Sequence, residues 1–492
     1  MQKLSKKAIL QYVLFGLIYT VAASVMTVCA WYAMTFDLEF KELLYTLASP
    51  LKGTGQSTVA QILFACLPVV LLLVALYVVA VLLLEKKIRW HYARRIGACF
   101  CAGLLVVSLI FSVFALRIPA YVKALSEKTT IYEDYYVDPD TVQITADGKP
   151  KNLIYIYLES METTYASRAL GGAQGVNYMP KLTALAEEHL SFSDKAAGGL
   201  GGFHTPLGTG WTMAALLATT SGVPFSFPLG ENGHNDMVLR EKFASGLTTL
   251  GDILKEKGYR QEFLCGSDSA FGGRKTYFEQ HGNYEIFDLF TAREKDYIPD
   301  DYKVWWGFED KYLYEIAKDE LTELAASDQP FNFTMLTVDT HHVGGFTCSL
   351  CEYQYVDKLA NVVSCADRQL AEFLDWCREQ DFYEDSVIVI TGDHPRMDTL
   401  LIGETDYYDR TIYNCFINAA TAPKGATTER LMTSFDLFPT TLAAMGFSIE
   451  GDCLGLGVNL FSTTPTLAEQ FGYEWLETEI NKFSDYYIRE FS

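Results

Sequence analysis

NLIYIYLES, at residues 152–160, is the stretch that decides the fold. The largely apolar run Asn152–Leu158 is followed directly by Glu159 and Ser160. Such a run is typical of a strand that is buried on both faces of a sheet. The same character recurs in FNFTMLTV at Phe331–Val338 and in SVIVIT at Ser386–Thr391. Between the strands, amphipathic patterns predict helices at Met179–His189, Thr248–Lys257, Tyr312–Ala326 and Cys365–Glu379. Strands that alternate with helices predict an α/β fold with a mainly parallel central sheet flanked by helices.

A second stretch places a hydroxyl where a helix should begin. It reads Gly210-Trp211-Thr212-Met213-Ala214-Ala215-Leu216-Leu217. A helix N-terminus presents unpaired N–H groups and partial positive charge, which suits a phosphate. Thr212 is therefore a candidate nucleophile, although this stretch taken alone favours an ordinary N-cap. The residues that follow the predicted strands favour the nucleophile.

Chemically competent side chains follow each of the three predicted strands. Glu159 follows the first strand, His341 and His342 follow the second, and Asp393-His394 follows the third. Because ligand sites in open α/β sheets form at the carboxyl ends of strands, we expect these side chains to share one edge. Taken singly, Glu159 could cap a turn and Asp393-His394 could form a turn with a satisfied histidine. Their joint placement favours a functional site.

With the Thr212 oxygen, Glu159, Asp393 and His394 form an oxygen-rich ligand set for one divalent cation. This set suits Mn²⁺ or Mg²⁺, and the imidazole also admits Zn²⁺. The metal would lower the pKa of the Thr212 hydroxyl and polarise a phosphoryl oxygen. The resulting alkoxide could attack phosphorus and hold the transferred group covalently.

Further basic groups could handle a phosphate. His341 or His342, on a glycine-containing loop, could donate a proton to a leaving oxygen or hold a phosphate oxygen. Arg274, in Phe271-Gly272-Gly273-Arg274, could grip the phosphate with its planar guanidinium, the alternative being a surface salt bridge. For His204 and His234, in glycine-rich or polar loops, we expect solvation rather than function.

The N-terminal quarter predicts a membrane region. Three uncharged apolar stretches there are each long enough to span a bilayer: Ala8–Phe36, Val59–Leu84 and Ile96–Leu116. The first is longer than the apolar part of a signal peptide and two more spans follow it, so we expect a retained anchor. We divide the chain into a transmembrane region at 1–117, a polar, tyrosine-rich, membrane-proximal connector at 118–150, and a catalytic domain at 151–492.

Basic residues set the expected orientation. Lys3, Lys6 and Lys7 precede the first span, and five Lys and Arg residues fill the short 85–95 loop. By the positive-inside rule the N-terminus is cytoplasmic, and three crossings leave the catalytic domain outside the cell membrane. The formal net charge of −22 excludes nucleic acid as an expected partner.

Seven of the eleven cysteines lie outside the spans, where disulfides can form. Cys348-Ser349-Leu350-Cys351 has the spacing of half a zinc site, but no second Cys/His pair follows at a suitable spacing. We therefore expect a disulfide between Cys365 and either Cys348 or Cys351, with the choice left open.

The motifs resemble a known family. Residues 130–465 are similar to the catalytic domain shared by lipoteichoic acid synthases and phosphoglycerol transferases, and are nearest to the phosphoglycerol transferase I type. The resemblance rests on six blocks in the expected order: YYVDP at 135–139, NLIYIYLESM at 152–161, GTGWTMAALLATTSG at 208–222, TVDTH at 337–341, GDH at 392–394 and LGLGVNLF at 454–461.

This resemblance implies an alkaline-phosphatase/sulfatase fold and a function. Thr212 corresponds to the family's nucleophile, and Glu159, Asp393 and His394 correspond to its metal ligands, usually for Mn²⁺. His341 corresponds to the substrate-contacting histidine and Arg274 to the phosphate-gripping arginine. The family transfers glycerol phosphate from phosphatidylglycerol, releases diacylglycerol, and passes the group to an acceptor hydroxyl, here expected on a glycan or glycolipid.

Departures from the family pattern leave the acceptor and any polymerising ability open. Lipoteichoic acid synthases usually have five spans, and their tryptophan near the arginine is replaced here by glycines at 272 and 273. The Thr212 segment also lacks the Pro and Arg of the Cys/Ser-x-Pro-x-Arg sequence of sulfatases, which argues against sulfatase activity. The alternatives are a phosphoethanolamine transferase, a phosphodiesterase that uses water and, last, a catalytically silent sensor module.

Overall fold

The computed structural model describes residues 6–36, 39–48, 56–87, 90–146, 148–228, 237, 241–403, 405 and 410–492. Three residues used in the predictions above, Lys3, Arg89 and His234, lie outside this part of the chain. The chain forms two compact units. One comprises Met1–Lys41 and Thr54–Lys123, and the other comprises Glu42–Gly53 and Ala124–Ser492.

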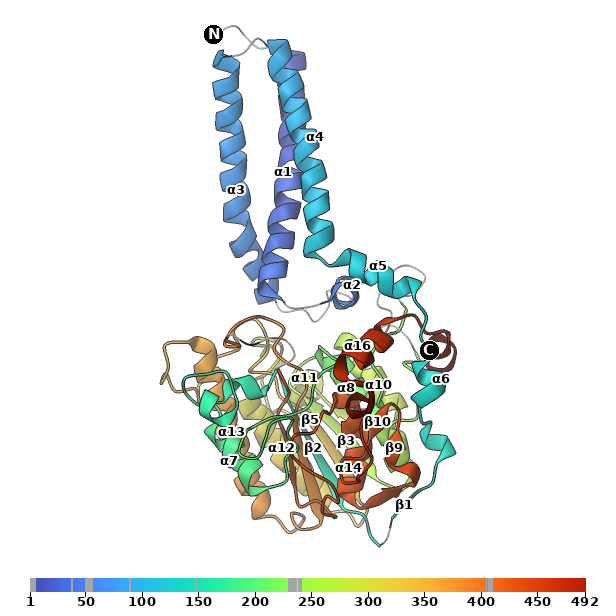
Figure 1. Ribbon diagram of the computed structural model, residues 1–492. Helices are drawn as coiled ribbons and strands as arrows, with labels where there is room; N and C mark the ends of the chain where they lie inside the picture. Colours follow the sequence, from blue (N-terminus) through green and yellow to red (C-terminus); the bar gives the residue numbers. More distant parts are fainter. Residues whose placement is uncertain are drawn as a thin grey trace. The chain divides into compact units, whose positions relative to one another are not determined.

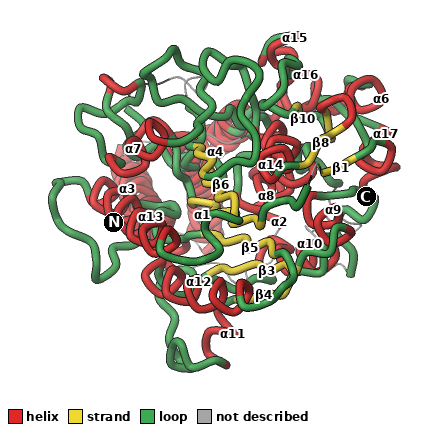
Figure 2. Tube along the Cα trace, turned by 90° about the horizontal axis from the view of Figure 1, so that it is seen from below, coloured by secondary structure: helices red, strands yellow, loops and turns green. Residues whose placement is uncertain are grey.

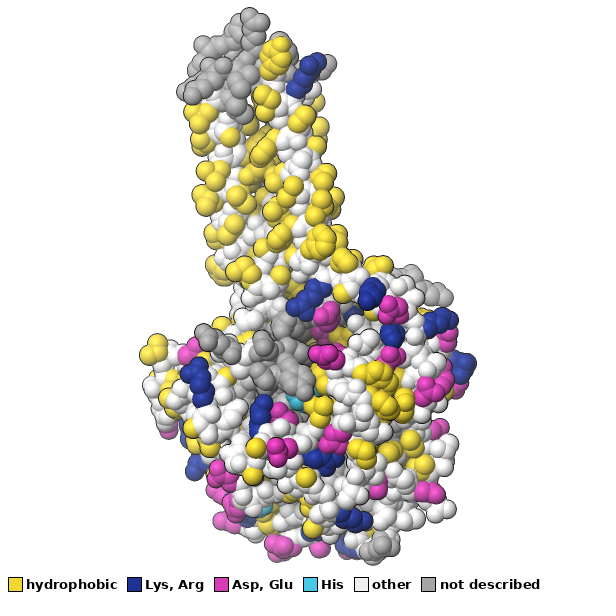
Figure 3. Space-filling model, in the orientation of Figure 1, with side chains coloured by type: hydrophobic (Ala, Val, Ile, Leu, Met, Phe, Trp, Pro, Cys, Tyr) yellow, Lys and Arg dark blue, Asp and Glu magenta, His cyan; other side chains and the backbone are white. Residues whose placement is uncertain are grey.

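Three long helices make up the first unit: α1 (Lys6–Thr35), α3 (Gln56–Lys87) and α4 (Trp90–Ala115). Each contains an apolar segment long enough to cross a membrane. Their large apolar side chains point outward along the described parts of the helices, as Figure 3 shows in yellow. Within the unit, α1 packs against both other helices, and the Ser108 hydroxyl on α4 donates to the Ala22 carbonyl on α1 (3.0 Å). These helices form a membrane anchor by length and composition.

A six-stranded sheet lies at the centre of the second unit (Figure 1). Its strands, in spatial order, are β4 (Glu285–Phe287), β3 (Arg260–Cys265), β5 (Phe331–Leu336), β2 (Asn152–Leu158), β6 (Ser386–Gly392) and β7 (Asn414–Ile417). All neighbouring pairs are parallel except β6 with the edge strand β7. The predicted α/β class and the three predicted strands are confirmed.

Alternate residues of β2 enter two separate cores, because successive side chains of a strand point to opposite faces. Leu153, Tyr155 and Tyr157 pack into one core, and Ile154 and Ile156 pack into the other. The first core includes residues of α8 (Thr212–Ser221), α9 (Leu250–Glu256), α10 (Arg274–Gln280) and α14 (Leu437–Met445). The second includes residues of α7 (Pro180–Glu188), α12 (Asp310–Ala325) and α13 (Lys358–Arg378). Helices thus cover both faces of the sheet (Figure 2).

Part of the expected connector is built into the second unit. β1 (Ile144–Ala146) pairs with β8 (Phe447–Ile449), and α6 (Ile131–Tyr135) packs against α17 (Asp485–Phe491). Tyr132 is buried there among aromatic rings. The tyrosines of this segment therefore serve packing. The remaining elements are α2 (Phe40–Ala48), α5 (Ile118–Ser126), α11 (Leu289–Glu294), β9 (Cys453–Leu454), β10 (Gly457–Val458), α15 (Leu467–Phe471) and α16 (Tyr473–Asn481).

Candidate active site

Thr212 is the first residue of α8 and not its N-cap. Trp211 holds the N-cap position with extended backbone and makes no side-chain cap. The Thr212 hydroxyl instead donates to Glu159 Oε2 (3.2 Å) and lies 3.5 Å from His394 Nε2. The first N–H groups of a helix lack intrahelical partners, so the hydroxyl lies beside a donor-rich helix end. This position suits a nucleophile that attacks a bound anion.

Glu159 leaves the end of β2 with its carboxylate held from several sides. The next residue, Ser160, adopts a left-handed backbone (φ 53°) and its hydroxyl donates to Glu159 Oε1 (2.6 Å). The Thr337 hydroxyl, just beyond β5, accepts a hydrogen bond from the Glu159 backbone N–H, and the Thr340 hydroxyl donates to the Glu159 backbone carbonyl. Burial would raise the pKa of the Glu159 carboxyl, but the nearby His341 and His394 lower it on balance. The carboxylate is therefore ionised as well as buried.

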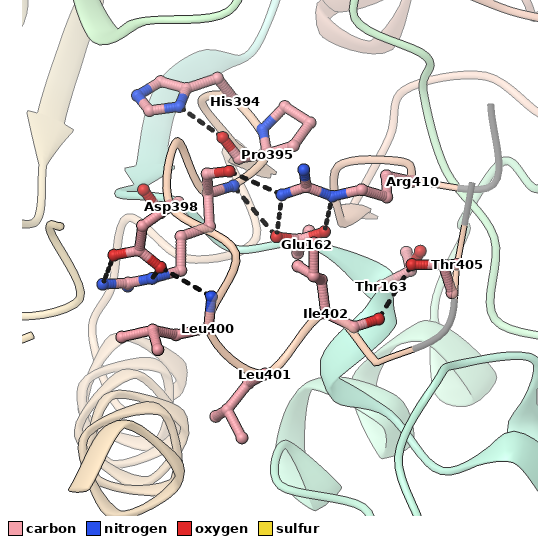
Figure 4. Close-up of polar contacts among 12 residues, drawn as sticks. Glu162, Thr163, His394, Pro395, Asp398, Leu400, Leu401, Ile402, Thr405 and Arg410 are labelled. Atoms are coloured by element: carbon pink, nitrogen blue, oxygen red, sulfur yellow. Dashed lines mark hydrogen bonds and ion pairs between the residues drawn. The ribbon is translucent and has the colours of Figure 1, made fainter. Parts of the chain in front are cut away.

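Asp393 and His394 follow β6 and are fully buried. Asp393 Oδ1 accepts from the backbone N–H groups of Ser160 and His394, which joins the ends of β2 and β6. His394 Nδ1 lies 2.8 Å from the Pro395 carbonyl (Figure 4). A carbonyl only accepts, so Nδ1 carries the hydrogen and Nε2 is left to face the site. This arrangement is typical of a histidine that ligates a metal through Nε2.

The donor set fits a divalent cation. Ligand atoms of Glu159, Asp393 and His394 all lie within 4.8 Å of one another. Among the described residues, Asp393 Oδ2 has no hydrogen-bond partner although it is buried. Burial and the charge of Glu159 raise the pKa of Asp393 to about 7, whereas the two carboxylates hold the pKa of His394 above its usual value in spite of its burial. Two adjacent buried carboxylates need compensating positive charge, which a bound cation would supply.

His341 lies next to this ligand set, and the ring of His342 stacks on the ring of His341. The rings of the two histidines are 4.2 Å apart, and Trp306 packs against His341 at 4.6 Å. His341 Nδ1 donates to the His342 carbonyl (2.7 Å). Nε2 is therefore the nitrogen that can gain or lose a proton. Burial lowers the pKa of both histidines, and that of His342 falls well below the ordinary value. Trp306 also packs on Phe271, which brings a tryptophan to the turn where the sequence has glycines.

Arg274 does not contact the other predicted site residues in the part of the chain that is described. Its guanidinium donates to the Ser267 hydroxyl (3.0 Å) and to the carbonyls of Asp268 (2.8 Å) and Phe271 (3.0 Å). It is buried, so the surface salt bridge considered above is not formed. A side chain on Gly272 would lie 3.5 Å from Met213, which places this turn beside the start of α8. Arg274 thus shapes a loop that borders Thr212.

A second set of buried charges lies beside the first and was not expected from the sequence. Arg410 donates to both oxygens of Glu162 (2.9 and 2.7 Å), and the Arg396 guanidinium donates to both oxygens of Asp398 (2.6 and 2.7 Å). Figure 4 shows Glu162 facing Arg410. Arg396 also donates to the Thr340 carbonyl (2.6 Å), directly before His341. These pairs brace the loops that carry His341 and His394.

A segment between the first two predicted spans also reaches the site. Tyr45 on α2 packs against Trp211 and Phe225, and its hydroxyl donates to the Phe227 carbonyl. Glu42 is buried, and its Oε1 lies 2.9 Å from where a side chain on Gly210 would begin. No motif marks this segment, because its contacts join residues far apart in sequence.

His204 corrects one expectation. It is 2% exposed and packs against Tyr473, so it is a buried histidine and not a solvated one. Glycines that flank it in sequence suggested an open loop. In the structure the segment pairs with Thr433, and its backbone exchanges hydrogen bonds with Met432 and Ser434.

Known proteins are similar to this chain in sequence. Phosphoglycerol transferase I of Salmonella choleraesuis is 31% identical over 434 residues, which cover 85% of this chain and 52% of that protein. Phosphoglycerol transferase I of Xanthomonas axonopodis pv. citri is 28% identical over 421 residues, which cover 82% and 56%. The chain spans about half the length of these curated relatives. They confirm the resemblance seen in the motifs.

Structural comparison adds the fold. A crystal structure of a protein in the alkaline phosphatase superfamily from Vibrio parahaemolyticus matches with a TM-score of 0.50 and 24% identity. The match covers 64% of this chain and 72% of that one. The family model described as Sulfatase matches residues 151–447, from β2 to the start of β8. The chain therefore belongs to the sulfatase family.

Proposed function

We propose that the chain is a membrane-anchored, metal-dependent phosphoglycerol transferase. It would move glycerol phosphate from phosphatidylglycerol to a glycan or glycolipid hydroxyl through a covalent threonine intermediate. The observation that carries this proposal is the Thr212 hydroxyl, at the start of α8, in contact with Glu159 and 3.5 Å from His394 Nε2. Relatives named phosphoglycerol transferase I support the group that is transferred.

In the first displacement, Thr212 Oγ1 attacks the phosphorus of the lipid phosphodiester as an alkoxide, after the hydroxyl proton has passed to solvent. A bond forms between Oγ1 and phosphorus, and the bond from phosphorus to the diacylglycerol oxygen breaks. The free N–H groups at the start of α8 bind the phosphoryl oxygens as negative charge builds up there. A divalent ion held by Glu159, Asp393, His394 and Thr212 would lower the pKa of the hydroxyl and neutralise the phosphoryl oxygens.

His341 is assigned the proton transfers. Near a bound phosphodiester the imidazole gains a favourable negative neighbour, so it can carry a proton to the departing diacylglycerol oxygen. It is then neutral, as its lowered pKa favours. In the second displacement it takes the proton of the acceptor hydroxyl, whose oxygen attacks phosphorus and releases Thr212. Arg274 and His342 shape the surrounding loops and are proposed to contact the glycerol phosphate.

The membrane anchor fits a lipid donor. An active site tethered to the bilayer searches for phosphatidylglycerol in two dimensions. The basic residues of the N-terminus and of the 85–95 loop support a cytoplasmic N-terminus, which puts the catalytic unit on the extracytoplasmic side. Mn²⁺ is the proposed ion, with Mg²⁺ or Zn²⁺ as the alternatives that the ligand set admits.

The test is donor turnover by the full chain in detergent. Purified protein with Mn²⁺ is given phosphatidylglycerol or phosphatidylethanolamine, and diacylglycerol release is measured for wild type, Thr212→Ala and Thr212→Ser. Thr322→Ala, an exposed threonine of α12, is the control. Release from phosphatidylglycerol alone, abolished by Thr212→Ala and partly kept by Thr212→Ser, supports the proposal.

Other results assign a different activity. Preference for phosphatidylethanolamine would replace the donor in the proposal. Free glycerol phosphate formed at the same rate with and without sugar acceptors would make the protein a phosphodiesterase. No turnover of either lipid by a metal-loaded wild type would contradict a transferase.

A further inference from the structure

Three cysteines form a compact buried cluster that the proposed reaction does not use. Cys348 and Cys351 lie in the loop after β5, and Cys365 lies on α13. They are 6%, 9% and 1% exposed. All three are free thiols, so the disulfide expected from Cys365 to Cys348 or Cys351 is not formed in this structure. The cluster is separate from the ligand set of Glu159, Asp393 and His394.

The spacing of the sulfurs matches metal coordination. Cys348 Sγ lies 3.8 Å from the Sγ of Cys351 and 3.8 Å from that of Cys365. Tetrahedral zinc has Zn–S bonds of about 2.3 Å, which sets the sulfurs about 3.8 Å apart. A disulfide would need a sulfur pair at about 2.05 Å. The Cys-x-x-Cys spacing of the loop pair is also that of zinc sites.

Gln369 is placed where a fourth ligand would lie. It lies one helical turn after Cys365 on α13, so both side chains project toward the same neighbours. Its amide nitrogen is 3.4 Å from Cys365 Sγ and 4.0 Å from Cys348 Sγ. The side chain is 6% exposed, and its Oε1 has no hydrogen-bond partner among the described residues. The two ends of an amide are interchangeable by rotation, and rotation turns Oε1 toward the sulfurs.

Basic groups around the loop balance the charge of three thiolates. The Lys311 ammonium, which pairs with Glu309 (3.2 Å), bonds to the Ser349 hydroxyl (3.1 Å), and Arg368 donates to the Leu350 carbonyl (2.8 Å). Both Ser349 and Leu350 lie between Cys348 and Cys351. One Zn²⁺ with three thiolates carries a net charge of −1, which the Arg368 guanidinium offsets.

We propose that Cys348, Cys351, Cys365 and Gln369 form a structural Zn²⁺ site. All four side chains are buried, as in closed structural sites that leave no position for substrate. The ion would join the loop after β5 to α13. That loop also carries His341 and His342, so zinc would fix the chain that presents the histidines to the active site.

Cobalt substitution tests this directly in the full-length protein in detergent. Co²⁺ bound by thiolates gives near-ultraviolet sulfur-to-metal charge-transfer absorption, which the oxygen- and nitrogen-only set around Thr212 does not give. Chelator-treated wild type is titrated with Co²⁺ alone, beside Cys365→Ser, Gln369→Ala, and Cys453→Ser as a control outside the cluster. We expect the band in wild type and Cys453→Ser, its loss in Cys365→Ser, and about tenfold weaker Co²⁺ binding in Gln369→Ala.

Thiol alkylation gives a second readout. It uses the wild type alone, so it does not depend on whether a variant folds. Zinc-loaded protein should protect Cys348, Cys351 and Cys365 from alkylation, and chelation should expose them, as read by peptide mass spectrometry. A disulfide-linked peptide pair from these cysteines, or a wild type with neither the cobalt band nor zinc-dependent protection, would overturn the proposal.

Discussion

Glu159 and Glu162 lie three residues apart at the same end of β2, and both are buried, yet their surroundings differ. Glu162 accepts two hydrogen bonds from Arg410 and one from the Arg396 backbone. Glu159 is held by hydroxyls and faces a second carboxylate, Asp393, and the basic groups that lower its pKa are the imidazoles of His341 and His394. A buried carboxylate that already has an arginine is structural. One that lacks an arginine and faces another carboxylate is suited to a metal.

We expect the largest effect from the substitution that removes the charge of Asp393. Asp393→Asn leaves the shape but deletes one carboxylate of the ligand set, so metal binding should weaken by at least 100-fold and lipid turnover should fall by about 1000-fold. Isothermal titration with Mn²⁺ and diacylglycerol release measure the two losses. Asp381→Asn, an exposed aspartate, serves as the control. If Asp393→Asn bound metal with wild-type affinity, Asp393 would not be a metal ligand, and the contrast between Glu159 and Glu162 would be wrong.

The second prediction concerns Glu162. Glu162→Gln removes the buried carboxylate that accepts two hydrogen bonds from Arg410, which should destabilise the protein by about 3 kcal/mol. Metal affinity at the neighbouring set should change little in the protein that remains folded. Thermal unfolding and Mn²⁺ titration of the purified chain separate the two properties. If Glu162→Gln lost metal binding while keeping its stability, the structural assignment would be contradicted.

Glu262 is a third kind of buried carboxylate, which differs from both Glu159 and Glu162. It lies on β3, and its Oε1 has no hydrogen-bond partner among the described residues. Burial, together with Glu320 and Glu285, raises its pKa to about 8. Lys295 and Arg260 lower this pKa only in part, so the group is neutralised by a proton.

This state of Glu262 predicts a pH dependence. The folded pKa lies above the ordinary value of 4.5, so the contribution of Glu262 to stability is fully present below about pH 4.5 and is lost as the pH rises through about 8. Glu262→Gln should therefore be more stable than wild type at pH 9, by about 1–3 kcal/mol, and nearly equal at pH 5. Unfolding is measured at both values, with the exposed Glu187→Gln as the control. An equal effect at the two pH values would exclude a titrating Glu262.

The smallest effect is expected at Gly210. A side chain there would come within 2.9 Å of Glu42 Oε1, the end of a flexible side chain that can move away. Gly210→Ala should displace the Glu42 carboxylate, whose charge helps to raise the pKa of His394, and lower turnover by less than tenfold. Initial rates of diacylglycerol release measure this. The double variant with Glu42→Ala should lose no more than Glu42→Ala alone. An additive loss would show that Gly210 acts independently of Glu42.

Local sequence predicted the elements that local rules determine. The buried strands Asn152–Leu158 and Ser386–Thr391 agree with β2 and β6 to within one residue, because uninterrupted apolar runs leave little choice of boundary. The meeting of Glu159 with Asp393 and His394 followed from the parallel order of those strands. Thr212 as a nucleophile needed this tertiary context, since its own segment taken alone favours an N-cap.

Sequence could not reveal contacts made across the fold. Gln369 lies near Cys348 because α13 packs against the loop after β5. This contact cannot be seen in the sequence, where Cys348 and Cys351 form only half of a zinc site. The pairing of Glu162 with Arg410 joins positions 248 residues apart. The sequence also did not reveal that the Arg274 guanidinium is held by its own loop, through the Ser267 hydroxyl and the Asp268 carbonyl.

Intact-protein mass spectrometry of the full chain, incubated with Mn²⁺ and phosphatidylglycerol without acceptor, tests whether Thr212 is the nucleophile. We expect an added glycerophosphoryl mass on wild type, located to the peptide that contains Thr212 and missing from Thr212→Ala. Turnover of the lipid with no adduct on Thr212, or an adduct that persists in Thr212→Ala, would contradict this role of Thr212.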